Sequence, residues 1–134
     1  MNERLLQFIW QFQYYNKLQL KTSQREELVI EKPGNWNHHQ GPDFSEAIIR
    51  IGATKWVGNI ELHLRSSDWH KHRHSADSNY SNIILHVVWE EDSAVNDQNG
   101  NCIPSFVLGP RVPKLLLERY RQMMETGMAI PCHP

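Results

Sequence analysis

The stretch DFSEAIIRIGATKWVGNIELHLR, residues 43–65, decides the fold. It predicts two β-strands, 43–51 and 54–65, which are joined through Gly52-Ala53. A connection this short is typical of a β-hairpin. Apolar and polar side chains alternate along the second strand, so one face should pack on the core while the other carries polar groups. The apolar positions are Ile60, Leu62 and Leu64, and the polar ones are Glu61, His63 and Arg65.

The flanking segments predict helices and further strands. Apolar residues at helical spacing indicate a helix over 3–15, and Pro113 with Gly127 bounds a second helix over 114–126. We expect short strands at 28–31 and 103–108, and a short helix beginning near Asp68, which Trp69 would pin onto the sheet. The run IILHVVW, residues 83–89, is apolar on both faces apart from His86, which is typical of a central strand. We therefore expect a single α/β domain over residues 1–134, with a mixed central sheet and flanking helices.

The composition excludes several classes of protein. Of the 134 residues, 40% are hydrophobic and 22% are charged, and the formal net charge is −1, so the chain lacks the basic excess of many nucleic-acid binders. Cys102 and Cys132 form no CxxC pair, which favours reduced thiols in a cytoplasmic protein. The sequence contains no run of about 20 apolar residues, which is the length that a membrane-spanning helix requires.

Three residues of the hairpin are candidates for chemistry. Glu61 and His63 are two positions apart, so they share one face of a strand about 7 Å apart. A carboxylate and an imidazole placed in this way can hold a divalent metal or pass a proton. Asp43 begins the preceding strand and would lie near them if the two strands pair. The strand register, which the sequence leaves open, decides whether the three side chains meet.

Pro42-Asp43 followed, eighteen positions after the aspartate, by Glu61-x-His63 is similar to the motif of the PD-(D/E)xK nuclease superfamily. The resemblance implies a restriction-endonuclease-like core in which Asp43 and Glu61 bind Mg²⁺ or Mn²⁺. His63 stands where that superfamily usually has lysine, and it would orient or deprotonate the attacking water. The function implied is a metal-dependent phosphodiesterase acting on nucleic acid. His86, in the neighbouring predicted strand, is a further catalytic candidate or, alternatively, a hydrogen-bonded core histidine.

A histidine-rich segment offers another site. Seven of the eight histidines lie between His38 and His86, and histidine is the commonest metal ligand. On a helix, His70, His74 and Asp77 share a face, whereas on a strand His70, His72 and His74 share one, so we count His70 and His74 as candidate metal ligands beside Asp43 and Glu61. An alternative is a Zn²⁺ or similar transition-metal site built from His70, His72 and His74, with His39 as an optional further ligand, which would serve a hydrolase or sensor. The remaining alternative is a solvated polar helix.

The strings LLQFIWQFQYYN, GPDFSEAIIRIG, WVGNIELHLRSSDWHKH and NIILHVVWEED resemble a bacterial family of unknown function, domain of unknown function family 2851. The resemblance implies that the chain is the N-terminal part of a longer protein, and it implies no activity. A non-catalytic binding module on a nuclease-like scaffold is therefore a rival function. In such a module Glu61 and His63 would belong to a structural hydrogen-bond network, and Asp43 would cap a turn.

Overall fold

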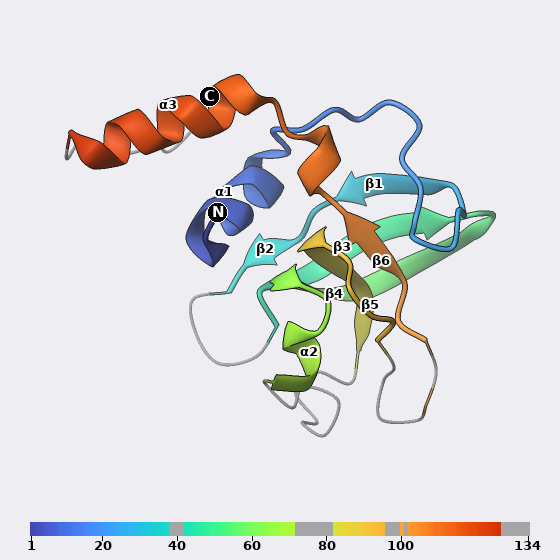
Figure 1. The fold of residues 1–134 in the computed structure, drawn as a ribbon. Coiled ribbons are helices and arrows are strands. Elements are labelled where there is room, and N and C mark those ends of the chain that lie inside the picture. Colours follow the sequence, from blue (N-terminus) through green and yellow to red (C-terminus); the bar gives the residue numbers. More distant parts are fainter. Residues whose placement is uncertain (38–41, 72–81, 96–99, 101, 127–134) are drawn as a thin grey trace.

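The computed structural model describes residues 1–37, 42–71, 82–95, 100 and 102–126. Within these residues the chain forms one curled sheet of six strands with helices on both faces (Figure 1). The strands are β1 (Leu28–Lys32), β2 (Asn35–Trp36), β3 (Phe44–Ile51), β4 (Thr54–Arg65), β5 (Ile83–Glu90) and β6 (Ser105–Val107). The helices are α1 (Glu3–Phe12), α2 (Asp68–Lys71), the 3₁₀ turn η3 (Gly109–Arg111) and α3 (Lys114–Glu125).

The sheet is mixed, as predicted. Its strand order is β1-β3-β4-β5-β6, and β2 pairs with β3 outside this path. β1, β3 and β4 run antiparallel, whereas β5 is parallel to β4 and β6 is parallel to β5. Ile51 pairs with Thr54, which confirms the hairpin through Gly52-Ala53. The sequence pattern did not predict β2, because two residues carry no alternation.

Helix α1 begins and ends at recognisable caps. The Asn2 side chain accepts a hydrogen bond from the Leu5 backbone N–H at 2.8 Å, which satisfies one of the otherwise unpaired donors of the first turn. The helix ends at Phe12, three residues before the predicted end, because Gln13 adopts a left-handed conformation with φ 56°. The buried residues of α1 lie on one face: Leu5, Leu6, Ile9 and Trp10.

The two faces of the sheet bury different side chains. The buried side chains of α1 belong to the same apolar cluster as Leu62 and Val87, which point from β4 and β5 to one side. On the other side, Trp69 of α2 packs with Val95 and Ile103 in a smaller cluster. β5 lies between β4 and β6 and is buried over most of its length, which confirms the prediction of a central strand.

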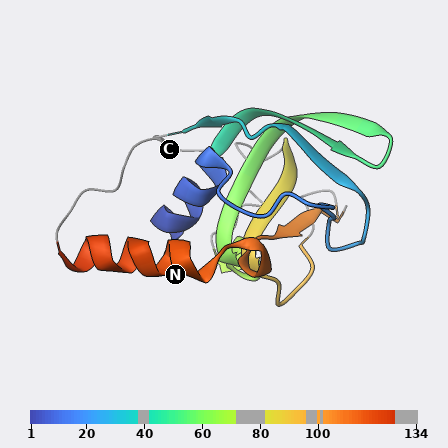
Figure 2. The ribbon, with the colours of Figure 1, turned by 90° about the horizontal axis from the view of Figure 1, so that it is seen from above.

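Helix α3 lies outermost. In both views α1 lies between α3 and the sheet (Figures 1 and 2). Tyr120 is the buried residue of α3, whereas Leu115 and Met124 are exposed. Among the described helices, none has both the length and the apolar character that crossing a membrane requires.

A β-bulge in β3 sets the register near the predicted site. Phe44 pairs with Ile60, but Ala47 pairs with Gly58, so β3 carries one extra residue between these two pairs. Glu46 lies in this bulge with φ 59°. Continuing the Phe44 register by one residue sets Asp43 directly opposite Glu61. Residues opposite each other in a sheet share a face, so the bulge brings the two carboxyl groups to the same side.

Candidate active site

Asp43 is held from two sides, just before β3 begins. Its Oδ2 accepts a hydrogen bond from the Leu62 backbone N–H at 2.8 Å, and its Oδ1 accepts one from Gln7 Nε2 at 3.2 Å. The Asn37 backbone N–H donates to the Asp43 carbonyl oxygen at 2.9 Å, which anchors the main chain. The half-buried carboxylate is therefore fixed between α1 and β4.

Glu61 lies against Asp43 and is only 3% exposed. Burial raises the pKa of the Glu61 carboxyl group far above its ordinary value, and the hydrogen bond to Asp43 and the charge of Asp43 raise it further. Backbone hydrogen bonds from Asp43 and Leu62 oppose this rise. The raised pKa favours the protonated form of the Glu61 carboxyl group, which can donate a hydrogen bond to Asp43.

Behind the carboxyl pair lie two histidine side chains. His63 Nδ1 and His86 Nε2 are 2.8 Å apart, and the residues are 2% and 0% exposed. At this distance one ring nitrogen donates a proton and the other accepts it, so the pair carries at most one positive charge. Glu61 pairs with His86 across β4 and β5, so all three side chains lie on the same face of the sheet. We call these two carboxyl groups and two imidazoles the carboxyl–imidazole network; hydrogen bonds join Asp43 to Glu61 and His63 to His86.

Trp69 covers the imidazoles. It is 0% exposed, and its ring centroid lies 5.3 Å from that of His86 and 6.5 Å from that of His63. Both contacts are edge-to-face, a favourable geometry for aromatic rings. This confirms the interpretation of Trp69 as the residue that pins α2 onto the sheet.

A serine–aspartate clamp fixes the chain where α2 begins. Asp92 accepts hydrogen bonds from Ser67 Oγ at 2.7 Å, from the Ser67 backbone N–H at 2.9 Å and from Ser66 Oγ at 2.8 Å. These bonds, Ser67 first and then Ser66, lower the pKa of Asp92 to about 2. The end of β4 is thus tied to the segment after β5, and Trp69 is set over the histidines.

The structure brings four of the predicted residues together: Asp43, Glu61, His63 and His86. His70 lies in α2, but the structure describes only the backbone of this residue. His39, His72 and His74 lie outside the described residues. Among the described side chains, no group of three or more histidine, cysteine or acidic residues is arranged to hold a metal ion.

Gln7 is the site residue that sequence reasoning missed. It lies 36 positions before Asp43 and belongs to neither of the predicted catalytic and metal-binding motifs, although it falls in one of the strings that resemble the family. The one available signal was an uncharged polar residue between the apolar positions of α1, and such residues are common on helices.

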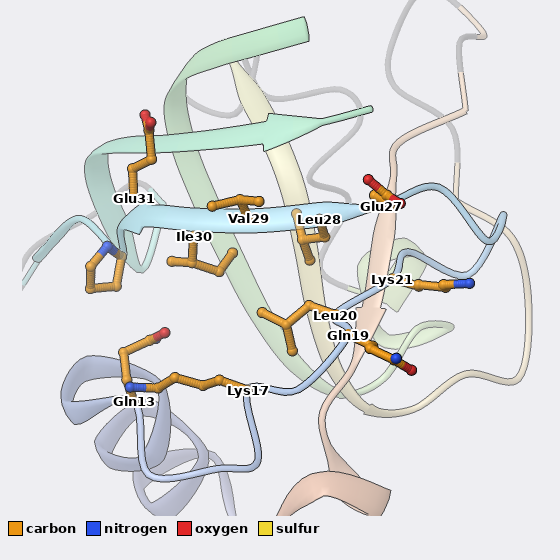
Figure 3. A pocket seen from close by; sticks show the side chains of 11 residues that line it. Gln13, Lys17, Gln19, Leu20, Lys21, Glu27, Leu28, Val29, Ile30 and Glu31 are labelled. Atoms are coloured by element: carbon orange, nitrogen blue, oxygen red, sulfur yellow. The ribbon is translucent and has the colours of Figure 1, made fainter. Parts of the chain in front are cut away.

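A cavity of about 680 Å³ lies apart from this cluster, between β1 and the segment 13–21 (Figure 3). Lysine and glutamate side chains line its rim, and leucines lie deeper. One of its glutamates, Glu31, is already paired with Arg50 at 3.0 Å. Neither Asp43 nor the histidine pair lines this cavity, so it shares no side chain with the carboxyl–imidazole network.

The fold and the site define a mixed α/β fold that carries the carboxyl–imidazole network, whose imidazoles lie beneath Trp69 of one short helix. The chain matches the family described as "Protein of unknown function (DUF2851)" over residues 3–134, and it belongs to that family. This confirms the family resemblance seen in the sequence strings. No curated protein matches the chain, and neither does any solved structure.

Proposed function

We propose that the chain is a Mg²⁺- or Mn²⁺-dependent phosphodiesterase that acts on nucleic acid. The observation that carries this proposal is the contact between the carboxyl groups of Asp43 and Glu61. Two carboxyl groups this close cannot both be ionised cheaply, so either a proton or a cation must accompany them. In the proposed active state, Asp43 and Glu61 hold a divalent cation in place of the shared proton.

The donor chemistry fits such an ion. Magnesium prefers oxygen ligands and commonly takes one or two protein carboxylates, with water and substrate phosphate oxygens completing the shell. Two carboxylates therefore suffice, although the described residues offer no third acidic, histidine or cysteine ligand. When bound, the cation supplies a Lewis acid for the phosphate and an activated water.

The order of elements supports a restriction-endonuclease-like core as the scaffold for this activity. Helix α1 precedes the antiparallel strands β1, β3 and β4, and α2 leads to β5, which runs parallel to β4. Asp43 stands just before β3 and Glu61-x-His63 lies within β4, so the two parts of the motif lie on adjacent antiparallel strands.

The histidine pair would serve as the proton acceptor. His63 stands at the position where the superfamily usually has lysine, and its ring is hydrogen-bonded to His86. The pair can take up one proton and share it across two rings, which suits a base that orients or deprotonates the attacking water.

One observation favours a second candidate, a non-catalytic binding module. Glu61, His63 and His86 are 3%, 2% and 0% exposed, so little of the network is open to a ligand. The Asp43 carboxylate accepts the Leu62 N–H as a structural cap would. In this reading the network stabilises the sheet, and another surface makes the contacts.

Metal titration separates the two candidates. Calorimetry with Mn²⁺, and separately with Zn²⁺, is performed on the wild type and on Asp43→Asn and Glu61→Gln variants. Glu91→Gln serves as the matched control because Glu91 is an exposed carboxylate just after β5. The phosphodiesterase proposal expects Mn²⁺ binding that both site variants abolish and the control retains, together with Mn²⁺-dependent cleavage of DNA or RNA.

Two results would contradict the phosphodiesterase proposal. Absence of Mn²⁺ binding by the wild type would favour the binding module. Zn²⁺ binding that is indifferent to Asp43 and Glu61 would point instead to the alternative transition-metal site, for which His70→Ala and His74→Ala are the direct tests.

A further inference from the structure

We infer that Gln7 of α1 is a positioning residue for the cation site, because it holds the Asp43 carboxylate in the orientation that faces Glu61. The inference rests on the proposed function and adds a residue that no motif identifies. Gln7 Nε2 donates to Asp43 Oδ1 at 3.2 Å, while the Leu62 backbone N–H donates to the other oxygen at 2.8 Å.

Two donors are needed because Asp43 precedes β3 rather than lying within it. A single hydrogen bond from Leu62 would leave the carboxylate able to rotate about that bond. A second donor on the other oxygen fixes the plane of the group. A carboxylate has about four acceptor positions, so these two bonds leave positions for a cation.

The element that presents Gln7 is well anchored. Helix α1 is capped by Asn2, and both Leu6, next to Gln7, and Trp10, nearly one turn further along, are fully buried. The Trp10 indole N–H also donates to the Pro33 carbonyl oxygen at 3.1 Å, which ties the helix to the chain after β1. The amide of Gln7 is thus held by packed neighbours rather than by a loop, as precise positioning requires.

The chemistry of the donor suits a cation site. A lysine or arginine at position 7 would neutralise Asp43 and repel a divalent cation. The amide of Gln7 orients the carboxylate and leaves its negative charge available. Partners that orient a metal ligand in this way typically contribute about 10- to 100-fold to metal affinity.

The test compares Mn²⁺ binding by Gln7→Leu and Gln7→Met, which remove the donor at similar side-chain size. Gln11→Leu is the matched control, because Gln11 lies one turn further along α1, is also half-buried and, among the described residues, is not a hydrogen-bond partner of Asp43. Calorimetry gives the affinity, and thermal unfolding in chelator reports whether the fold has changed.

We expect both Gln7 variants to bind Mn²⁺ about 10- to 100-fold more weakly than the wild type. Gln11→Leu should bind like the wild type, and the melting temperatures in chelator should stay close to that of this control. A purely structural role would lower the melting temperature without a selective loss of affinity, and that result would overturn the inference.

The failures of the inference and of the proposed function are distinguishable. If Asp43→Asn abolishes Mn²⁺ binding while both Gln7 variants bind as tightly as the wild type, Gln7 is not a positioning residue and the cation site stands. If the wild type itself does not bind Mn²⁺, both the site and the role of Gln7 are wrong.

Discussion

Substitution of Glu61 by glutamine should make the metal-free chain more stable at neutral pH. Burial, together with Asp43, raises the pKa of Glu61 in the folded state, whereas in the unfolded chain it returns to about 4.5. Above that pH the folded state binds one more proton than the unfolded state, so the free energy of unfolding of the wild type falls as the pH rises. The stabilisation is fully present below the unfolded pKa and is lost as the pH rises toward the folded pKa.

The size of the effect follows from one proton. Each pH unit between the two pKa values changes the free energy of unfolding by about 1.4 kcal/mol. Between about pH 5.5 and about pH 7.5, the difference in the free energy of unfolding between Glu61→Gln and the wild type should therefore grow by about 2.7 kcal/mol. Glutamine remains neutral and can donate its N–H to Asp43 as the protonated carboxyl group does, so the variant escapes this loss.

The assay is urea denaturation in the presence of chelator at several pH values, with Glu91→Gln as the control. Glu61→Gln should approach the wild type near pH 4.5 and become progressively more stable above it, while the control tracks the wild type. Parallel pH profiles for the wild type and Glu61→Gln would refute the reasoning, because they would mean that Glu61 ionises in the folded chain as readily as in the unfolded one.

Three further substitutions test the packing around the site, each by denaturant unfolding. Trp69→Ala should cost about 3–5 kcal/mol, since it empties a fully buried indole site above the histidines; a loss no larger than that of an exposed residue would contradict its pinning role. Asn2→Ala should lower the free energy of unfolding by about 1 kcal/mol, because it removes the acceptor of the Leu5 backbone N–H. Asn2→Ser, which keeps an acceptor, should retain most of the stability. Gly58→Ala should cost about 1–3 kcal/mol because an added Cβ would lie 2.7 Å from Ile84 Cγ2, and an unchanged stability would show that β5 yields there.

The sequence predicts the hairpin and the central strand well, for a physical reason. The alternation of apolar and polar residues from Ile60 to Arg65 has the period of two that is typical of a strand, and β4 has the predicted bounds. The polar face, predicted to be opposite the core, is also covered, because Glu61 and His63 are buried. The apolar run of β5 is equally diagnostic of a strand buried on both faces. Both strands are recognised from the pattern of apolar residues along a short stretch of sequence, without knowledge of which strands pair.

The site is less predictable because its contacts are long-range. Asp43, Glu61 and His63 were found through their types and spacing, but the burial of His63 and its bond to His86 depend on how β4 and β5 pair. Gln7 was missed because a hydrogen bond between a helix and a distant strand leaves no periodic signal. The predicted end of α1 was three residues too late, because Gln13 adopts a left-handed backbone conformation that glutamine rarely takes and that the sequence therefore does not predict.

The bulge in β3 makes the spacing of the two acids a matter of parity. In a hairpin with a two-residue turn such as Gly52-Ala53, directly opposed residues are an odd number of positions apart, as Ile51 and Thr54 are. Asp43 and Glu61 are eighteen apart, an even number, so they can oppose each other only if an odd number of bulges intervenes. Deleting one residue at the bulge would shorten the spacing to seventeen, an odd number, so Asp43 would still oppose Glu61, now across a strand without the bulge. In related chains with the same two-residue turn, an even spacing of the two acids would therefore indicate a bulged strand.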